Sequence, residues 1–358
     1  MTGNKTRLPL GEFDTIRLNA PYVTDPLALY TQLCQHNPNN LLLESVEIDS
    51  KAGTQSLLLV DACLRIECRG RTVRVRALTS NGVQLQRLLE QRLSAVITQT
   101  RVADELQLDF PASDRTLDED SRLKGSSVLD VLRTLQRELQ CPQGKEALFM
   151  AGSFAYDLIA SFEDLPEVPE GSNDCPDYCF YVAETLITID HIKQSTQLVA
   201  CLFGGEEDEQ LDARYARLTA RLESFKQACQ QPLPAPQGTA PLTGALAVDK
   251  GDKQFCAEVE KLKGFIRRGD IFQVVPSRSF SLPCPDPLAA YRRLKQTNPS
   301  PYMFYVQDEG FTLFGASPES AVKFCAASRQ VEMYPIAGTR RRGLNPDGSI
   351  NLDLDGRI

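Results

Sequence analysis

Three segments in the last quarter of the chain carry polar groups beside apolar runs. Gln273 lies inside one such run, Glu319 follows a Ser-Pro pair, and Gly338 and Thr339 follow another run. A carboxylate can act as a general acid when burial raises its pKa. Glycine lets the backbone approach a ligand closely, and freed N–H groups beside a threonine hydroxyl can hold a carboxylate. These residue types could therefore bind a carboxylate ligand and donate a proton.

Each segment also has a plainer interpretation. Strand alternation could place Gln273 at the surface, whereas a buried glutamine would need hydrogen-bond partners that a ligand can supply. Ser317 could cap a helix, with Pro318 at its first position and Glu319 in its first turn. Residues 338–342 could form a strand-exit loop that ends in three solvated arginines. The pattern alone leaves both interpretations of each segment open.

The residues around these segments predict helices and hairpins. A helix that ends at Gly269 would have an apolar face with the spacing of an amphipathic helix. That face consists of Phe255, Val259, Leu262 and Ile266. A strand is expected at 271–280, and a second helix at Asp286-Pro287, where Asp suits the N-cap and Pro the first helical position. Two antiparallel hairpins are then expected, over 303–315 and 321–336.

The N-terminal part combines strands with a long helix. Short β-rich runs at 55–61, 63–69 and 72–78 predict an antiparallel meander, with Gly70 between the last two runs. Between residues 208 and 229, apolar residues recur every three or four positions, which predicts a helix. The apolar face of this helix consists of Leu211, Tyr215, Leu218, Leu222 and Phe225.

An uncharged stretch rich in Pro, Ala, Gly and Thr divides the chain. Residues 231–247 have the composition of a linker or long loop. We therefore expect an N-terminal domain over 1–230 and the beginning of a second domain over 248–358. Consecutive antiparallel strands with helices grouped outside them predict an α+β fold rather than a doubly wound sheet. No Gly-rich phosphate-binding loop of either common kind occurs.

Composition excludes several classes of partner. The net charge of −8 argues against nucleic acid, whose phosphates need a basic surface. The start of the chain has no apolar signal-like region and no stretch approaches a membrane span, so the cytoplasm is expected. The 11 cysteines are scattered, only 2 histidines occur, and no paired C-x-x-C exists, so buried free thiols are expected and a zinc site is not.

Six segments in order along the chain resemble one enzyme family. They are LLLESVEIDSK, GSFAYDLIASFEDLP, QVVPSR, NPSPYMFY, FGASPES and YPIAGTR. These segments resemble anthranilate synthase component I of the enterobacterial type, within the chorismate-utilising enzymes. The resemblance implies a chorismate-binding fold with packed antiparallel sheets and helices outside. It also implies conversion of chorismate and ammonia to anthranilate and pyruvate, the first step of tryptophan biosynthesis.

The resemblance assigns roles to the polar segments. Glu319 matches the acid that protonates the leaving C4 hydroxyl, and Gly338 and Thr339 match residues that bind chorismate. Mg²⁺ would hold the ring carboxylate, with its protein ligands expected beyond Ile358. The chain has no amidotransferase signature, so ammonia would come from glutamine through a separate amidotransferase subunit, in a hetero-oligomer.

Two positions distinguish this family from related chorismate enzymes. Isochorismate and salicylate synthases carry a lysine base where Gln273 stands, and aminodeoxychorismate synthase commonly carries a nucleophilic lysine where Ala337 stands. A glutamine amide has no useful basicity and an alanine cannot form a covalent adduct. The nucleophile would therefore have to enter the chorismate site already in its reactive form, because neither position supplies a base or an amine. Aminodeoxychorismate synthase component I remains the nearest alternative activity.

Family members are inhibited by L-tryptophan at a second site. The matching positions are Ser45, Pro301, Tyr302 and Met303, with Leu43 and Glu44 beside them. Without the resemblance, both segments would be interpreted as ordinary strands of the core. The absence of tryptophan from the composition suits an enzyme made when tryptophan is scarce.

Members of the family are longer than this chain. We therefore expect a fragment that is inactive by itself, whose parent protein carries the activity. A non-catalytic tryptophan-binding regulator is the alternative from a different class. Arg340, Arg341 and Arg342 have no role in either interpretation.

Overall fold

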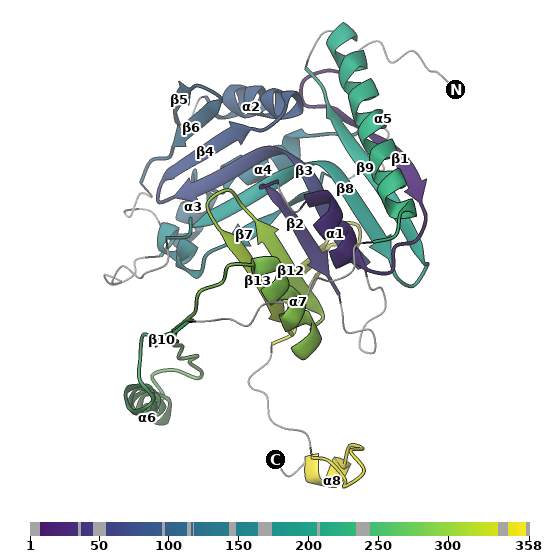
Figure 1. The fold of residues 1–358 in the computed structure, drawn as a ribbon. Helices are drawn as coiled ribbons and strands as arrows, with labels where there is room; N and C mark the ends of the chain where they lie inside the picture. The colour runs from purple at the N-terminus through teal and green to yellow at the C-terminus, as the bar shows by residue number, and fades with distance from the viewer. Residues whose placement is uncertain are drawn as a thin grey trace. The chain divides into compact units, whose positions relative to one another are not determined.

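A computed structural model describes most of the chain as two units (Figure 1). One unit comprises residues 1–237 and 294–316, and the other comprises 238–293 and 317–358. The described residues are 8–34, 37–45, 55–94, 97–112, 116, 118–142, 148–163, 174–205, 208–233, 244–335 and 343–355.

The first unit is built on one large antiparallel sheet. Its strands follow the order β1-β9-β8-β3-β2-β12-β13, while β4, β5, β6 and β7 branch from that path. The strands are β1 Phe13–Ala20, β2 Asn40–Glu44, β3 Gln55–Arg69, β4 Thr72–Ala77, β5 Thr98–Val102, β6 Glu105–Asp109, β7 Met150–Phe154, β8 Tyr178–Asp190, β9 Ser195–Phe203, β12 Tyr302–Gln307 and β13 Thr312–Ser317. The α+β prediction is confirmed, because strands pair antiparallel and helices pack against them.

The predicted meander is confirmed with one difference. The runs at 55–61 and 63–69 form the single strand β3, which shifts register against β8 between Leu59 and Leu64. β3 then turns at Gly70, whose φ of +58° suits glycine, and pairs antiparallel with β4. The two runs merge because the irregularity bends a continuous strand without ending it.

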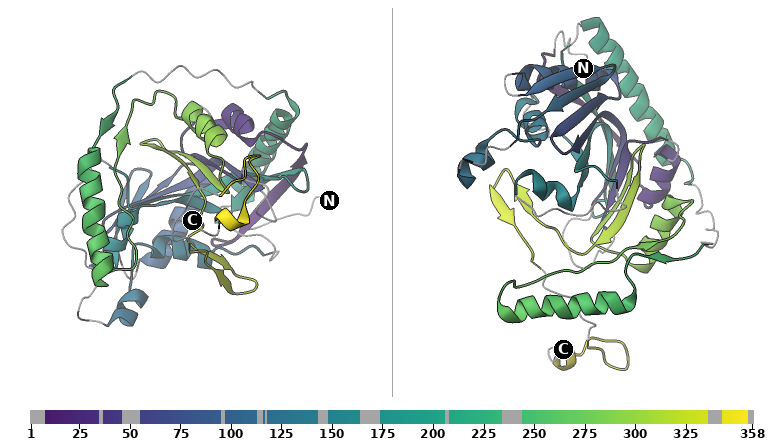
Figure 2. Two further views of the ribbon diagram at one scale, coloured as in Figure 1. Left: turned by 90° about the horizontal axis from the view of Figure 1, so that it is seen from below. Right: turned by 90° about the vertical axis from the view of Figure 1, so that its left-hand side faces the viewer.

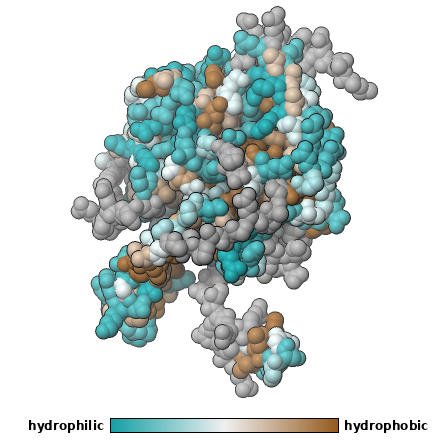
Figure 3. Space-filling view, viewed as in Figure 1, coloured by the Kyte–Doolittle hydropathy of each residue, from teal (hydrophilic) through white to brown (hydrophobic). Residues whose placement is uncertain are grey.

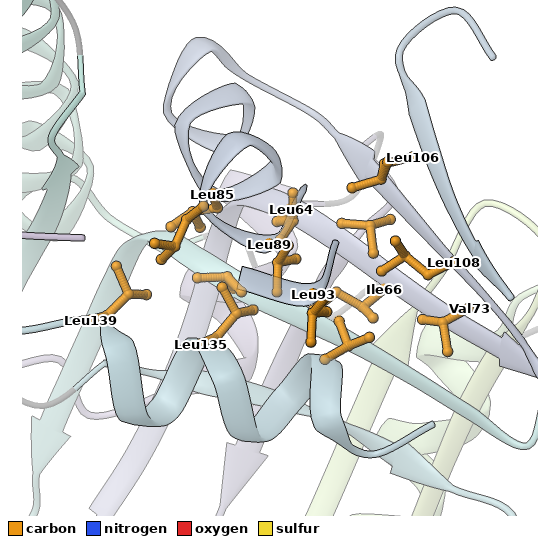
Figure 4. Close-up of a cluster of buried hydrophobic side chains, with 14 of the residues drawn as sticks. Leu64, Ile66, Val73, Leu85, Leu89, Leu93, Leu106, Leu108, Leu135 and Leu139 are labelled. Carbon is orange, nitrogen blue, oxygen red and sulfur yellow. The ribbon is translucent and has the colours of Figure 1, made fainter. Parts of the chain in front are cut away.

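The helices of the first unit cover parts of this sheet (Figure 2). They are α1 Pro26–Cys34, α2 Ser80–Leu93, α3 Glu119–Lys124, α4 Asp130–Glu138, the 3₁₀ helix η1 Tyr156–Ser161 and α5 Asp208–Gln230. Leucines of α2 and α4 point toward side chains of β3, β4 and β6 in one buried cluster (Figure 4).

The predicted helix at 208–229 is α5, and four of its five expected core residues are buried. Tyr215 is 45% exposed, so its expected burial is wrong: the buried face is narrower than the periodicity suggested.

The second unit contains short elements. They are β10 Ala247–Val248, α6 Asp252–Arg268, β11 Phe280–Ser281, β14 Lys323–Cys325, β15 Gln330–Glu332 and α8 Leu352–Asp355, while α7 Pro287–Thr297 crosses the division between the units. α6 ends as predicted at Gly269, whose φ is +79°. α7 starts as predicted, since Asp286 Oδ1 accepts from the Ala289 N–H at 3.0 Å. Both expected hairpins occur, as β12–β13 and β14–β15.

Two expectations in this part of the chain need correction. The strand predicted at 271–280 is wrong: apart from Phe280 in β11, those residues are in no strand. A strand forms where a neighbouring strand completes its backbone hydrogen bonds. In the predicted segment and the residue after it, only Phe280 and Ser281 have such a neighbour, which is β10. The linker expected at 231–247 includes Ala247, which belongs to β10, and 234–243 lie outside the described residues.

The two units do not follow a simple division of the chain. Residues 294–316 belong to the first unit because β12 pairs with β2. In the described parts of the chain, no helix has the length and apolar character needed to cross a membrane.

Candidate functional site

The two segments matched to tryptophan binding lie on neighbouring strands. β2 and β12 pair antiparallel, with Met303 opposite Glu44 and Phe304 opposite Leu43. Ser45 directly follows the last residue of β2, and Pro301 directly precedes the first residue of β12. All six predicted positions are therefore brought together at one end of this strand pair, although they come from distant parts of the sequence.

Side chains at this strand end alternate between buried and accessible. Met303 is 1% exposed, Tyr302 is 36% exposed, and Pro301 is buried. Neighbouring residues of a strand face opposite sides of the sheet, which explains why Tyr302 differs from Met303. The aromatic ring of Tyr305, also on the buried side, lies edge-on to Tyr30 with ring centroids 5.6 Å apart.

A buried ion pair fixes Glu44 at this site. Lys295, from the last turn of α7, places Nζ 2.5 Å from Glu44 Oε1. The Glu44 side chain is only 2% exposed, and that of Lys295 is 23% exposed. Burying an unpaired carboxylate costs free energy. The Lys295 ammonium offsets this cost for Glu44 in the sheet. The pair joins α7 to β2.

Two further residues, Lys295 and His191, lie near this site but in none of the segments that predict it. His191 Nε2 lies 2.9 Å from Ser56 Oγ, and its Nδ1 lies 3.0 Å from the Tyr22 hydroxyl. Burial lowers the pKa of His191, the Glu44 carboxylate opposes this effect, and the Lys295 ammonium adds to it. No local pattern marks either residue. The pairing of β8 with β3, and of β3 with β2, brings His191 near Glu44, whereas Lys295 comes from α7, which precedes β12.

The predicted catalytic carboxylate lies on the surface. Glu319 is exposed and follows β13, and its N–H lies 3.3 Å from Ser317 Oγ. No helix begins at Ser317 in this described stretch, so the helix-cap interpretation is wrong. The hydroxyl instead accepts from the backbone two residues later, which is a local turn. Gln273 is also exposed, as its surface interpretation expected.

The predicted residues of the third segment cannot be placed. Ala337, Gly338 and Thr339, together with Arg340, Arg341 and Arg342, lie outside the described residues. Their roles stay predictions. Glu319 and Gln273 belong to the second unit, whereas the six tryptophan-matched positions belong to the first unit.

The described residues do not supply a metal site. Across those ranges, no group of three or more His, Cys, Asp or Glu side chains is arranged to hold an ion. A Mg²⁺ site needs several oxygen ligands in near-octahedral geometry. The residues described here therefore do not fit the Mg²⁺ that the resemblance implies.

Similarity to known proteins covers almost the whole chain. Relatives named anthranilate synthase component 1 are 50% identical over 98% of this chain in Salmonella typhimurium, 50% over 94% in Escherichia coli, and 47% over 98% in Vibrio parahaemolyticus. The matches cover 66%, 64% and 63% of those relatives, so the chain spans slightly less than two thirds of their length.

A solved structure and a family model complete the comparison. The crystal structure of anthranilate synthase component I from Streptococcus pneumoniae has a TM-score of 0.48 and 21% identity, over 87% of this chain and 59% of that chain. The family model described as chorismate binding enzyme matches residues 89–353. This chain therefore belongs to the chorismate binding enzyme family.

Proposed function

We propose that the protein to which this chain belongs is anthranilate synthase component I, which forms anthranilate and pyruvate from chorismate and ammonia. The observation that carries this proposal is the 47–50% identity to relatives of that name over 94–98% of the chain. Its localisation would be cytoplasmic. The division into an N-terminal domain over 1–230 and a catalytic domain from 248 onward belongs to the same proposal.

The residue types at two positions support ammonia as the nucleophile. Gln273 cannot deprotonate water near neutral pH, and Ala337 offers no amine. The nitrogen would therefore come from outside the chain, through an amidotransferase subunit that hydrolyses glutamine. That subunit makes the working enzyme a heteromer.

Glu319 is proposed as the acid of the first step. Ammonia forms a bond to chorismate C2 while the C4–O bond breaks, and Glu319 protonates the departing oxygen so that it leaves as water. Gly338 and Thr339 are proposed to bind the substrate. The intermediate then loses pyruvate and becomes aromatic. Mg²⁺ belongs to this proposal as the ion of the whole enzyme, and the described residues offer no site for it.

L-tryptophan is proposed to inhibit the enzyme at the end of the β2–β12 pair. The register there gathers Glu44, Ser45, Tyr302 and Met303 from two distant segments. A ligand that contacts both strands would stabilise one geometry of this pairing and so couple the site to the catalytic residues.

A further part of the proposal is that the 358-residue chain is inactive alone. It spans 63–66% of the relatives' length, and large apolar side chains are exposed in the described part of its second unit. Brown groups among teal ones are visible on this part in Figure 3. Phe272 is 101% exposed and Val275 is 80% exposed, on either side of the proposed active-site residue Gln273. A working chorismate site would need these groups enclosed, since catalysis of this kind requires water to be excluded.

A chimera tests the activity. This chain would replace the matching part of the Escherichia coli relative, and the purified chimera would receive chorismate, Mg²⁺ and ammonium. We expect fluorescent anthranilate from the chimera and none from the 358-residue chain. Isochorismate or 4-amino-4-deoxychorismate as the product would contradict the proposed activity. Anthranilate from the isolated chain would contradict the inactivity.

A substitution in the chimera tests the role of Gln273. Gln273→Lys supplies a base at this position, so water should compete with ammonia at C2 and a hydroxylated product should appear. Gln273→Met gives an unbranched side chain without a basic group, as a control for altered shape. Chromatography of the products distinguishes the outcomes, and an unchanged product mixture for Gln273→Lys would contradict the role.

A further inference from the structure

An ion pair at the end of the β2–β12 strand pair closes a ring around residues matched to tryptophan binding. Lys295 belongs to the last turn of α7, and its Nζ lies 2.5 Å from Glu44 Oε1 on β2. Residues 296–301 lead from Lys295 to the first residue of β12. β12 pairs with β2, where Met303 lies opposite Glu44. The chain, the strand register and the ion pair therefore form one closed ring, which lies within the first unit.

The strand register alone does not hold the whole tryptophan-matched site. The paired positions of β2 and β12 end with Met303 opposite Glu44. Pro301 and Tyr302 precede Met303, and Ser45 follows Glu44, so all three lie past the last position at which these two strands pair. Their relative placement therefore depends on contacts beyond that register. On the β12 side, α7 connects directly to this segment through residues 298–300.

The connection from α7 to β12 transmits the position of the helix. The Asn298 N–H donates to Leu294 O at 2.8 Å, which continues the helical hydrogen bonding by one residue past the end of α7. Ser300 and Pro301 are both buried. Proline fixes its own φ, so this short connection has little freedom. A shift of α7 relative to β2 would therefore move Pro301 and Tyr302.

Burial makes the ion pair an effective fastener between α7 and β2. The Glu44 side chain is 2% exposed, whereas exposed ion pairs contribute little. Removing the Lys295 ammonium would leave a buried carboxylate with less compensation for its charge, which is costly. The carboxylate would then move toward water or take up a proton, and either change alters the end of β2. A cation in the last turn of a helix is also favoured by the helix dipole.

We propose that Lys295 is a positioning residue for L-tryptophan, an inference that rests on the proposed inhibition at the end of the β2–β12 pair. Lys295 holds the end of α7 against Glu44 and so fixes where Pro301 and Tyr302 lie relative to Ser45. This role requires no contact between Lys295 and the ligand. Without the ion pair, the ligand has to order the strand ends when it binds, and that cost weakens inhibition.

Tryptophan inhibition of the chimera with the Escherichia coli relative tests this role. The rate of anthranilate formation is measured with Mg²⁺, ammonium and chorismate at the KM of each variant, and the readout is the L-tryptophan concentration that halves the rate. A loss of folded enzyme lowers the uninhibited rate without changing this concentration, so the readout separates positioning from stability. Lys295→Met should raise the concentration about tenfold or more. Lys295→Arg keeps a cation that can donate to Glu44 and should raise it less.

Further variants and a second measurement keep the test decisive. Lys295→Gln keeps an N–H donor without the charge and should cause a smaller rise than Lys295→Met, so it carries the test where Lys295→Met does not fold. Lys124→Met removes the exposed ion pair with Asp120 in α3 and should leave the half-inhibiting concentration unchanged. Calorimetric titration of the same variants with L-tryptophan should give dissociation constants in the same order, and this measurement does not depend on activity.

The outcomes distinguish this inference from the proposed function. An unchanged half-inhibiting concentration and an unchanged dissociation constant in Lys295→Met and Lys295→Gln would refute the positioning role and leave the proposed function standing. An unsubstituted chimera that forms anthranilate but neither binds L-tryptophan nor is inhibited by it would refute the proposed inhibitor site and this inference together.

Discussion

The first unit has a large enclosed apolar core, whereas most apolar side chains in the described part of the second unit stay at least partly exposed. Leu64, Leu89 and Leu135 are each 0 to 1% exposed in the core of the first unit. In α6 of the second unit no residue is buried, although its sequence has a clear apolar face. Local signals therefore suffice to form a helix, but its contribution to stability depends on what packs against it.

The largest expected effect concerns a buried ion pair of the first unit. Arg65 Nε and Nη2 donate to Asp308 at 2.8 and 3.0 Å, and the Tyr181 hydroxyl also donates to Asp308. Asp308→Ala removes the bidentate partner of Arg65 and the acceptor of the Tyr181 hydroxyl, and leaves Arg65 with Glu67 and Glu309 as partners. It should lower the free energy of unfolding by about 3 kcal/mol. Asp252→Ala, which breaks the exposed pair with Arg278, should cost about 1 kcal/mol or less. Urea unfolding measures both, and equal losses would contradict the comparison.

A pair of leucines provides the next test. Leu89→Ala creates a cavity among fully buried side chains and should cost about 2–5 kcal/mol. Leu262→Ala, on the partly exposed face of α6, leaves no enclosed cavity and should cost about 1 kcal/mol or less. Thermal unfolding of the two variants compares them. A larger loss for Leu262→Ala would mean that α6 packs against a partner that encloses it.

Replacing the glycine at the end of α6 should lower the stability of the helix by a smaller amount, through the backbone conformation of that residue alone. Gly269 has a φ of +79°, and an added Cβ would meet nothing within 4 Å. Gly269→Ala should therefore cost about 1–2 kcal/mol through conformation alone. Gly251→Ala, also in open space but with a φ of −67°, is the control and should cost less. Hydrogen exchange of the α6 amides measures both, and equal protection in the two variants would contradict the argument.

The same contrast explains how much of this structure could be predicted from the sequence. The start of α7 and the end of α6 depend on Asp286 and Gly269, whose effects are local, and both predictions are confirmed. The strand predicted at 271–280 depended on a partner that the local sequence does not specify.

For the candidate site, the sequence and its resemblance named Glu44 and Met303 but not Lys295 or His191. The first two lie in recognisable segments. The other two reach the site only through the pairing of distant strands, which no short pattern encodes. For Gln273 the sequence left a buried and a surface position open. Strand alternation alone does not show which face is buried, because that depends on the neighbouring strands.

The smallest expected effect is a pH dependence confined to the first unit. Burial lowers the pKa of His191 below its ordinary value of about 6.5. A group whose folded-state pKa is depressed stabilises the fold above its unfolded pKa, and that stability is lost as pH falls toward the folded pKa. The free energy of unfolding should therefore decrease from about pH 6.5 downward, before the carboxylates titrate. His191→Gln keeps a side chain that can bond Ser56 and Tyr22 but cannot titrate, so this decrease should become smaller. Urea unfolding between pH 7 and pH 5 measures the slope, and an identical slope in the two proteins would show that His191 does not cause it.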